Sequence, residues 1–237
     1  MRKIILWFLL LTISVLSAYC MTTQQIIDQV RLLEKDNNSA NYRYTDQNLI
    51  DRINIIQDEI AIKTMCIQSR EYIDTIDGTQ EYRLPENCLN IIRVGYMVLN
   101  STDAYKRIPW TTIAGQDIAN AYWQNLANGN PTEYYRRTDY IGLKPAPSST
   151  YAGTDYIQID YNIRPTMLTL VTEIPLDGIY NLTGFHQAII YGVAALCEYD
   201  KGNTNGYTLM QTIYVDWLAK IKDIYYTEPD KNTNFVR

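Results

Sequence analysis

The chain has 237 residues, of which 46% are hydrophobic and 20% are charged, so it can bury a sizeable core and is not an intrinsically disordered protein. Its net charge of −5 and the absence of clustered Lys and Arg exclude a surface that wraps duplex nucleic acid. Four cysteines without CxxC spacing, and no histidine near them, argue against a metal site and favour free thiols in a reducing compartment.

The first 20 residues resemble a secretory signal peptide. Arg2 and Lys3 precede an apolar run that ends at Leu16, and the small residues Ala18 and Cys20 follow at the spacing of a cleavage site. The run is short for a membrane span. Two interpretations remain open at this point: the protein is exported, or translation starts at Met21, which directly precedes a helical pattern.

Residues 21–70 are predicted to form two helices. Thr22 or Thr23 caps the first helix, and Thr45 caps the second, which runs from Asp46 to about Met65. Apolar residues recur at steps of three and four, which places them on one face of each helix: Ile26, Ile27, Val30 and Leu33, then Leu49, Ile53, Ile56 and Ile60.

Residues 71–175 are predicted to form a mostly antiparallel β region. Asp77-Gly78 is typical of a type I′ turn and predicts a hairpin of the first two strands. The alternation after Tyr156 predicts a half-buried strand. We expect a short helix around Ala114–Trp123 and a possible further strand at Met167–Ile174. The strands are expected at Tyr72–Ile76, Gln80–Leu84, Ile91–Val98, Lys106–Pro109, Glu133–Arg137, Tyr140–Lys144 and Tyr156–Asn162.

Residues 176–226 return to helical periodicity. One helix is predicted from Leu182 to about Tyr199 and a second from Asn205 to Tyr226, and the polar tail 227–237 is not expected to fold alone. Their apolar faces contain Phe185, Ile189, Val193 and Leu196, then Met210, Ile213, Trp217, Ile221 and Ile224. The chain is therefore predicted to be an α+β protein: a helical bundle of two N-terminal and two C-terminal helices with an inserted β region.

Enzymatic chemistry has little support in the sequence. His186, the single histidine, has no fitting Ser or Cys nearby, and we interpret it as structural or interfacial. No nucleophile-elbow, P-loop, dinucleotide or HExxH motif occurs. Asp58-Glu59 and Glu173 could serve as a carboxylate pair of a glycosidase, but a solvated surface is the simpler interpretation.

Aromatic residues suggest contact surfaces. The chain has 21 Tyr and 3 Phe, which fits interfaces and also fits an A- and T-rich genome. Trp110, Tyr122 and Trp123 could bind carbohydrate, although core packing or a subunit contact is favoured. The run 134–137, Tyr-Tyr-Arg-Arg, could stack on single-stranded nucleic acid, although an edge or interface strand is simpler.

Several motifs occur together in a fixed order. They are Tyr82-Arg83-Leu84-Pro85, Ile91-Ile92-Arg93-Val94, Pro131-Thr132-Glu133-Tyr134, the run Ile141 to Pro147 with its two prolines, and Tyr161 to Pro165. With the flanking helices, from Met21 to about Tyr225, the chain resembles the head-to-tail adaptor (connector) proteins of tailed bacteriophages, of the short-tailed-phage type.

The resemblance implies a non-enzymatic virion protein without a cofactor. Such proteins form a homo-oligomeric ring, typically a dodecamer, beneath the portal protein, with a tail or nozzle protein below and DNA passing through without sequence-specific binding. It implies that the helices form the ring, that the β region faces outward or toward the tail, and that the C-terminal segment reaches into the portal. We therefore expect portal docking by Asn232, Asn234, Phe235, Val236 and Arg237, and subunit contacts by Tyr134, Tyr135, Tyr207, Tyr225 and Tyr226.

The family assembles in the host cytoplasm and has no use for a signal peptide or a membrane, so the resemblance favours Met21 as the start and a virion location. The alternative is an exported bacterial envelope protein, a β-rich binding module that is secreted or periplasmic if the leader is genuine. A third possibility, a cell-wall glycosidase, would need an essential carboxylate pair. Neighbouring genes for a portal protein and a terminase would distinguish these alternatives.

Overall fold

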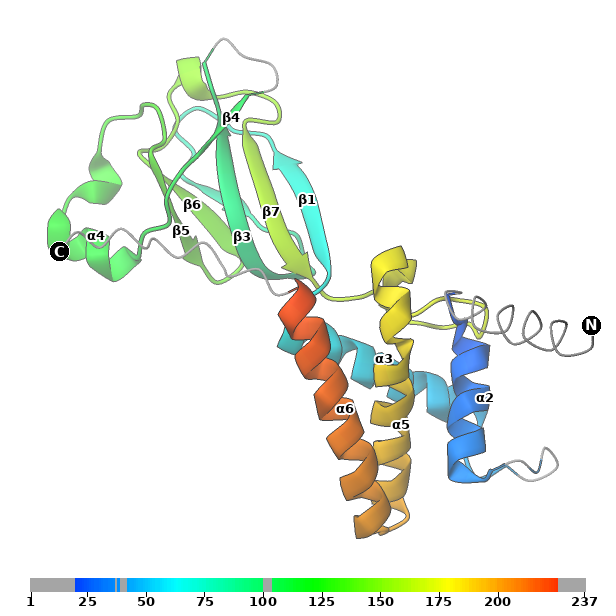
Figure 1. Ribbon diagram of the computed structural model, residues 1–237. Coiled ribbons are helices and arrows are strands. Elements are labelled where there is room, and N and C mark those ends of the chain that lie inside the picture. The colour runs from blue at the N-terminus through cyan, green and yellow to red at the C-terminus, as the bar shows by residue number, and fades with distance from the viewer. Residues whose placement is uncertain (1–19, 37, 39–41, 100–103, 226–237) are drawn as a thin grey trace, which may run out of the picture. The chain divides into compact units, whose positions relative to one another are not determined.

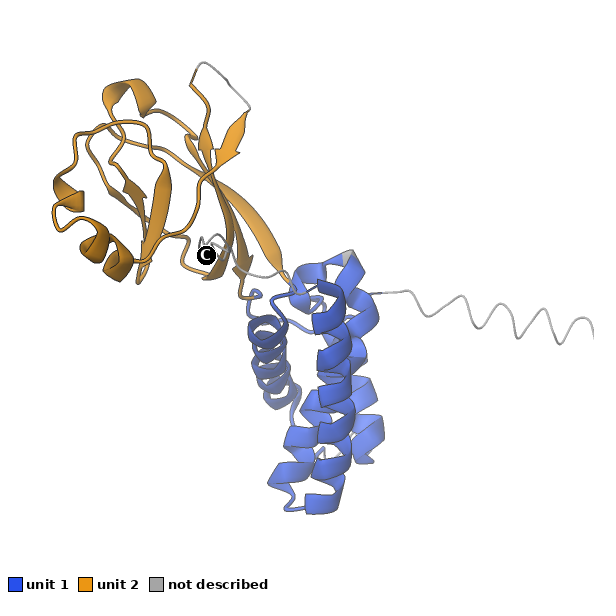
Figure 2. Ribbon diagram, turned by 60° about the vertical axis from the view of Figure 1, so that its left-hand side comes forward, with its two compact units in different colours: residues 1–66, 165–226 blue, residues 67–164, 227–237 orange. Residues whose placement is uncertain are grey.

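The computed structural model describes residues 20–36, 38, 42–99 and 104–225, which form two compact units (Figures 1 and 2). Of these described residues, the helical unit combines those up to 66 with those from 165 to 225, and the β unit contains those between 67 and 164. The fold is α+β, with a helical bundle and an inserted β region, as the sequence predicts.

The two N-terminal helices begin at threonine caps. Helix α2 spans Thr23–Glu34 and helix α3 spans Asp46–Thr64. The side chain of Thr22 accepts a hydrogen bond from the backbone N–H of Gln25 at 3.3 Å, and the Gln25 side chain accepts one from the N–H of Thr22 at 2.9 Å. Thr45 forms the same capping box with Asn48, so the first orphan donors of both helices are satisfied.

Helix α5 (His186–Asp200) is the centre of the helical unit. It packs against α2, α3 and α6 (Thr204–Tyr225), and most of its side chains are buried (Figure 1). Gly192 permits a close approach to α3, because a Cβ at this position would lie 2.8 Å from Cγ2 of Ile56. Two 3₁₀ segments, η4 (Leu176–Gly178) and η5 (Tyr180–Phe185), precede α5, which therefore begins later than the predicted Leu182.

The segment 165–175 leads into these 3₁₀ turns and is not a strand, which corrects the prediction for Met167–Ile174. Side chains of α3 occupy the hydrogen-bonding groups that a neighbouring strand would use. Asn54 donates to the Leu168 carbonyl at 2.9 Å and accepts from its N–H at 2.8 Å. Gln57 donates to the carbonyl of Thr166 at 2.9 Å. Both side chains are buried, so the backbone of this segment is satisfied without a sheet.

The β unit consists of two antiparallel sheets that enclose one core (Figure 1). The larger has the order β1-β7-β3-β4 and the smaller the order β2-β6-β5. The strands span Gln68–Ile73 (β1), Glu81–Arg83 (β2), Cys88–Met97 (β3), Tyr105–Arg107 (β4), Glu133–Arg137 (β5), Tyr140–Lys144 (β6) and Ile157–Ile163 (β7); η3 (Ser149–Tyr151) lies between β6 and β7.

The predicted hairpin at Asp77-Gly78 is wrong. The dipeptide does form a turn, with a φ of +73° at Gly78 and a 3.0 Å bond from the N–H of Thr79 to the carbonyl of Ile76. The flanking strands nevertheless do not pair: β1 pairs with β7, and β2 pairs with β6. The turn leads from one sheet to the other because Tyr82 is buried in the shared core, while its hydroxyl donates to the carbonyl of Thr79 at 2.8 Å.

Two further predictions need correction. Strand β7 is not half-buried: it lies between β1 and β3, and even Gln158 and Asn162 are buried. The single helix expected at Ala114–Trp123 is instead a short helix, α4 (Ile113–Ala119), followed by the 3₁₀ turn η2 (Trp123–Asn125). The chain leaves the helix at Asn120, whose backbone is extended with a φ of −158°.

Candidate subunit interface

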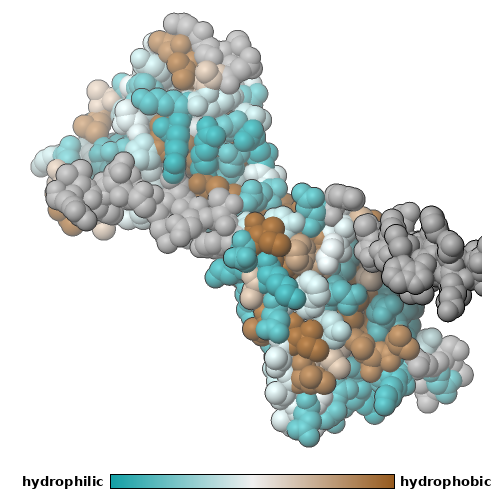
Figure 3. All heavy atoms as spheres, in the orientation of Figure 1, coloured by the Kyte–Doolittle hydropathy of each residue, from teal (hydrophilic) through white to brown (hydrophobic). Residues whose placement is uncertain are grey.

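Helix α6 buries three side chains against the bundle and carries a row of more exposed apolar side chains next to them. In α6, which the structure describes from end to end, the buried side chains are Tyr214, Leu218 and Ile221. Leu209 and Ile224 are 59% and 61% exposed, and Ile213 and Trp217, at steps of four from Leu209, are half-buried. We call Leu209, Ile213, Trp217 and Ile224 the outer row. Apolar side chains gather on the visible face of the helical unit in Figure 3.

Aromatic contacts surround Trp217, the central residue of the C-terminal half of α6. The ring of Phe185 meets the rings of Trp217 and Tyr225 edge to face, at centroid distances of 6.2 Å and 5.8 Å. The ammonium group of Lys220 lies 4.4 Å from the Trp217 centroid. The Tyr225 hydroxyl donates to the Asn181 carbonyl at 2.6 Å. Trp217, the largest side chain of the row, is therefore restricted before any partner binds.

A second apolar set lies on α2 and α3. Leu32 is 60% exposed, and Ile55 and Ile62, one above the other on α3, are 58% and 39% exposed. These side chains belong to the faces of α2 and α3 that point away from the buried residues of the same helices. The helical unit therefore carries two chemically similar but distinct exposed surfaces, one on α6 and one on α2 and α3.

A polar cluster ties the end of α2 to the end of α5. The Lys201 ammonium contacts the carboxylate of Glu34 and donates to that of Glu198 at 2.8 Å. Burial raises the pKa of Glu34, whereas the hydrogen bond from Lys201 lowers the pKa of Glu198. This cluster fixes the hairpin between α5 and α6, beside which the Tyr199 and Tyr207 rings meet at a centroid distance of 5.7 Å.

The predicted interface tyrosines fall into three groups. Tyr207 and Tyr225 are half-buried in the helical unit, where they can still contact a neighbour. Tyr134 and Tyr135 are 1% and 2% exposed in the β unit, so the structure places neither ring at a surface. Tyr226 and the predicted portal-docking residues Asn232, Asn234, Phe235, Val236 and Arg237 lie outside the described residues.

The residues considered for catalysis have structural contacts. His186 is 1% exposed, its Nδ1 accepts a hydrogen bond from the N–H of Met21 at 3.2 Å, and burial lowers its pKa to about 4. Glu173 accepts hydrogen bonds from the N–H groups of Thr169 and Leu170 at 2.6 Å and 2.7 Å, which lower its pKa. His186 is thus neutral at pH 7, and the Glu173 carboxylate closes a loop.

The aromatic candidates of the β unit do not form one platform. Trp123 is 1% exposed and meets the Tyr135 ring edge to face at 5.1 Å, whereas Tyr122 is 75% exposed. Arg136 and Arg137 are exposed, and Arg136 donates to the carbonyl of Leu89 at 3.2 Å. Two buried tyrosines beside two exposed arginines do not offer a stacking surface for single-stranded nucleic acid.

The described part of the chain offers neither a metal site nor a membrane-spanning helix. In it, no three or more His, Cys, Asp or Glu side chains come together as a metal site. Over the same residues, no helix combines the length and the apolar character that a membrane crossing requires.

Comparison with known proteins gives one family. The family model described as SU10 adaptor protein matches residues 21–228, a range that contains every helix and strand described above. No curated protein matches the chain.

Proposed function

Because the chain belongs to the SU10 adaptor protein family, a family of phage head-to-tail adaptors, we propose that it forms a closed ring of identical subunits beneath the portal protein. Its general role is that of a structural adaptor protein of the bacteriophage virion, and its family is not an enzyme family. The ring would link the DNA-filled capsid to the tail, with the portal on one side and a tail or nozzle protein on the other.

The observation that carries this proposal is the outer row of α6. Leu209 and Ile224 leave more than half of their surface in water, although the same helix has a complete buried side. Exposed apolar rows on pre-organised helices are typical of surfaces that become covered in an assembly.

Ring closure requires two different surfaces on each subunit, because head-to-tail contacts are heterologous. The helical unit has both: the outer row on α6, and the exposed Leu32, Ile55 and Ile62 on α2 and α3. We assign the outer row of one subunit to the α2–α3 surface of its neighbour. Twelve such contacts would close the ring that the family resemblance suggests.

The charge of the helical unit is consistent with DNA passing through the ring without being held. Residues 21–66 and 165–226 contain 13 Asp and Glu against 8 Lys and Arg, which is a net charge of −5. A lumen of this sign repels phosphates weakly and provides none of the clustered cations that bind a duplex.

Portal docking by the C-terminal tail rests on the family resemblance. We propose that Phe235 and Val236 provide apolar contacts and that Arg237 provides a charged one. Deletion of residues 227–237 should leave the helical unit folded and abolish binding to the portal protein. Portal binding by the truncated chain would assign docking to another segment.

Electron microscopy tests the proposal as a whole. The full chain and the chain 21–237 are each mixed with the portal protein of the same genome and viewed by negative stain. A ring stacked coaxially on the portal is the expected result. A folded preparation that stays monomeric and ignores the portal would overturn the proposed ring, while family membership would stand.

A further inference from the structure

The β unit carries an exposed apolar protrusion between β4 and β5. It consists of α4, η2 and the residues around them, and its outer side presents Ile118, Tyr122 and Leu126 at steps of four. These side chains are 88%, 75% and 40% exposed. We call the three residues the knob.

The knob stands on a buried aromatic base. Trp123, adjacent to Tyr122 in the chain, is 1% exposed, and its indole N–H donates to the Asp117 carboxylate at 2.7 Å. Its ring meets that of Tyr135 in β5 edge to face. Trp123 therefore anchors η2 to the smaller sheet, while the adjacent Tyr122 is exposed.

A second anchor lies under α4. Gln116 is 5% exposed, and its amide donates to the hydroxyl of Thr111 at 2.7 Å and to the carboxylate of Glu133 at 2.5 Å. The Lys144 ammonium donates a hydrogen bond to the side-chain carbonyl oxygen of Gln116. The protrusion is therefore pinned to β5 and β6 at two points, which reduces the conformational entropy lost when its tip binds.

The protrusion is also almost uncharged. Between residues 108 and 132 the sequence contains a single side chain that is charged at neutral pH, that of Asp117, which accepts the hydrogen bond from Trp123. Ile118, Tyr122 and Leu126 are themselves uncharged, so burying these three side chains against another surface desolvates no charge of the knob.

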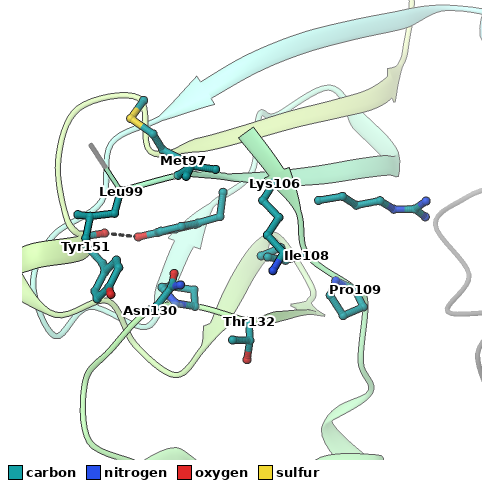
Figure 4. Close-up of a pocket in the computed structure, with 12 residues that line it drawn as sticks. Met97, Leu99, Lys106, Ile108, Pro109, Asn130, Thr132 and Tyr151 are labelled. Atoms are coloured by element: carbon teal, nitrogen blue, oxygen red, sulfur yellow. Dashed lines mark hydrogen bonds between the residues drawn. The ribbon is translucent and has the colours of Figure 1, made fainter. Parts of the chain in front are cut away.

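The same unit contains a pocket with apolar and cationic lining residues. It has a volume of about 380 Å³ and is lined by the end of β3, by β4 and by residues 130–132 (Figure 4). Met97, Leu99 and Ile108 provide apolar wall, and Lys106 and Arg107 provide cations. An aromatic ring with a hydroxyl suits this lining, since its body is apolar and its face attracts a cation.

We propose that the knob of one copy inserts Tyr122 into this pocket on the neighbouring copy of the same chain. The proposal rests on the proposed ring and adds a second contact to it, made by the β units. Every copy carries one knob and one pocket, so the contact repeats around a closed ring in the way a heterologous interface must.

The size of the contact determines what it can do. Three side chains cover far less than the roughly 800 Å² per partner of a standard stable interface, so the knob cannot hold two free chains together. Within a ring the neighbouring units are already tethered, at effective concentrations of the order of millimolar, and a weak contact is then occupied. The knob therefore secures an assembled ring and does not start assembly.

Cysteine cross-linking tests the proposal directly. The full chain with both Tyr122→Cys and Leu99→Cys is assembled with the portal protein, oxidised mildly and separated on a non-reducing gel. A covalent ladder extending beyond the dimer is expected, because each subunit joins two neighbours. The unsubstituted chain and the two single variants control for the native thiols, of which Cys66 and Cys197 are buried.

The outcomes separate the two proposals. Rings in the micrographs without a ladder overturn the knob contact and leave the proposed function intact. A disulfide that forms only within one chain, between the two cysteines introduced at positions 122 and 99 of the same subunit, would also overturn the knob contact and leave the proposed function intact. Absence of rings overturns the proposed function, and the knob contact with it.

A second pair of variants checks the role. Ile118→Ser with Tyr122→Ser should leave the unfolding midpoint of the subunit unchanged, while rings dissociate at roughly tenfold higher subunit concentration on dilution. Tyr140→Ser, at an exposed residue of β6 outside knob and pocket, is the matched control. Rings of unchanged stability that fail to bind a tail protein would show that the knob contacts the tail, and would overturn the proposal.

Discussion

Replacing Leu209 and Ile224 together by serine should abolish ring assembly and leave the subunit folded. Their exposed fractions are 59% and 61%, so a little over half of each side chain remains to be buried by a neighbour. Full burial of a Leu or Ile side chain contributes about 1.5–3 kcal/mol, and the remaining exposed part therefore about 1–2 kcal/mol. The pair then contributes about 3 kcal/mol to each subunit contact, which is roughly a 100-fold change in its association constant.

The assay is sedimentation velocity with the portal protein, paired with urea unfolding of the subunit alone. Leu170→Ser is the matched control, because Leu170 is also 59% exposed but lies in the segment 165–175 and not on α6. The control should assemble normally. Both proteins should unfold within about 0.5 kcal/mol of the unsubstituted chain, since the changed side chains are largely in water.

Normal assembly of the double variant would refute the assignment of the outer row to the subunit interface. Equal losses of assembly in the double variant and in Leu170→Ser would point instead to a general effect of apolar surface. A fall in the urea midpoint of the double variant would mean that the row supports the bundle, and the 100-fold value would then not apply.

Three further predictions concern stability. Gly142→Ala should lower the free energy of unfolding by about 1–3 kcal/mol, because its Cβ would lie 2.0 Å from Cζ of Tyr135; an unchanged urea midpoint would contradict this packing. Gly192→Ala should destabilise the bundle despite the better helix propensity of alanine, and adding Ile56→Val should recover part of the loss, which a double-mutant cycle measures. Burial holds the His186 pKa at about 4, below the 6.5 of the unfolded chain, so the unfolded state takes up the proton first as pH falls. Stability should therefore be complete above pH 6.5 and decline by about 3 kcal/mol toward pH 4, and a His186→Gln variant that keeps the same slope would exclude this histidine as the cause.

The helices could be predicted because their signals are local. Thr22 and Thr45 cap α2 and α3 as expected, since a capping box involves residues only three positions apart. The C-terminal ends carry no comparable signal. Lys35 and Met65 adopt the left-handed conformation there, with φ of 54° and 53°, although neither residue type favours it.

Strand pairing could not be predicted, because it depends on residues far apart in the chain. The turn at Asp77-Gly78 depends on its own backbone and carries no information about which strands pair, so it does not predict that β1 pairs with β7 and β2 with β6. The pairing of β1 with β7 joins residues about 90 positions apart, such as Arg70 and Asp160. Ile73 of β1 packs against the core cluster that contains Ile157 and Ile159 of β7, and this cluster exists only in the folded unit.

The sequence predicts that α6 has an apolar face, but not which of its residues are exposed. Periodicity places Met210, Ile213, Trp217, Ile221 and Ile224 on one apolar face of α6. Of these only Ile221 is fully buried, and Ile224 is 61% exposed. The spacing of apolar residues identifies an apolar face of a helix. It does not tell which residues of that face are buried within the same subunit. Leu209, outside the predicted stripe, was the available signal, because it widens the apolar surface beyond what one neighbouring helix can bury.

The discontinuous helical unit imposes an order on synthesis. Helices α2 and α3 leave the ribosome first, but α5, against which both pack, begins 122 residues after the end of α3. At about 5–20 residues per second, their apolar faces wait roughly 6–24 s for that partner. The β unit is continuous in sequence and can fold during this interval. A nascent adaptor is therefore most exposed to aggregation while its inserted unit is already complete, so that a chaperone holding the two early helices would raise its yield.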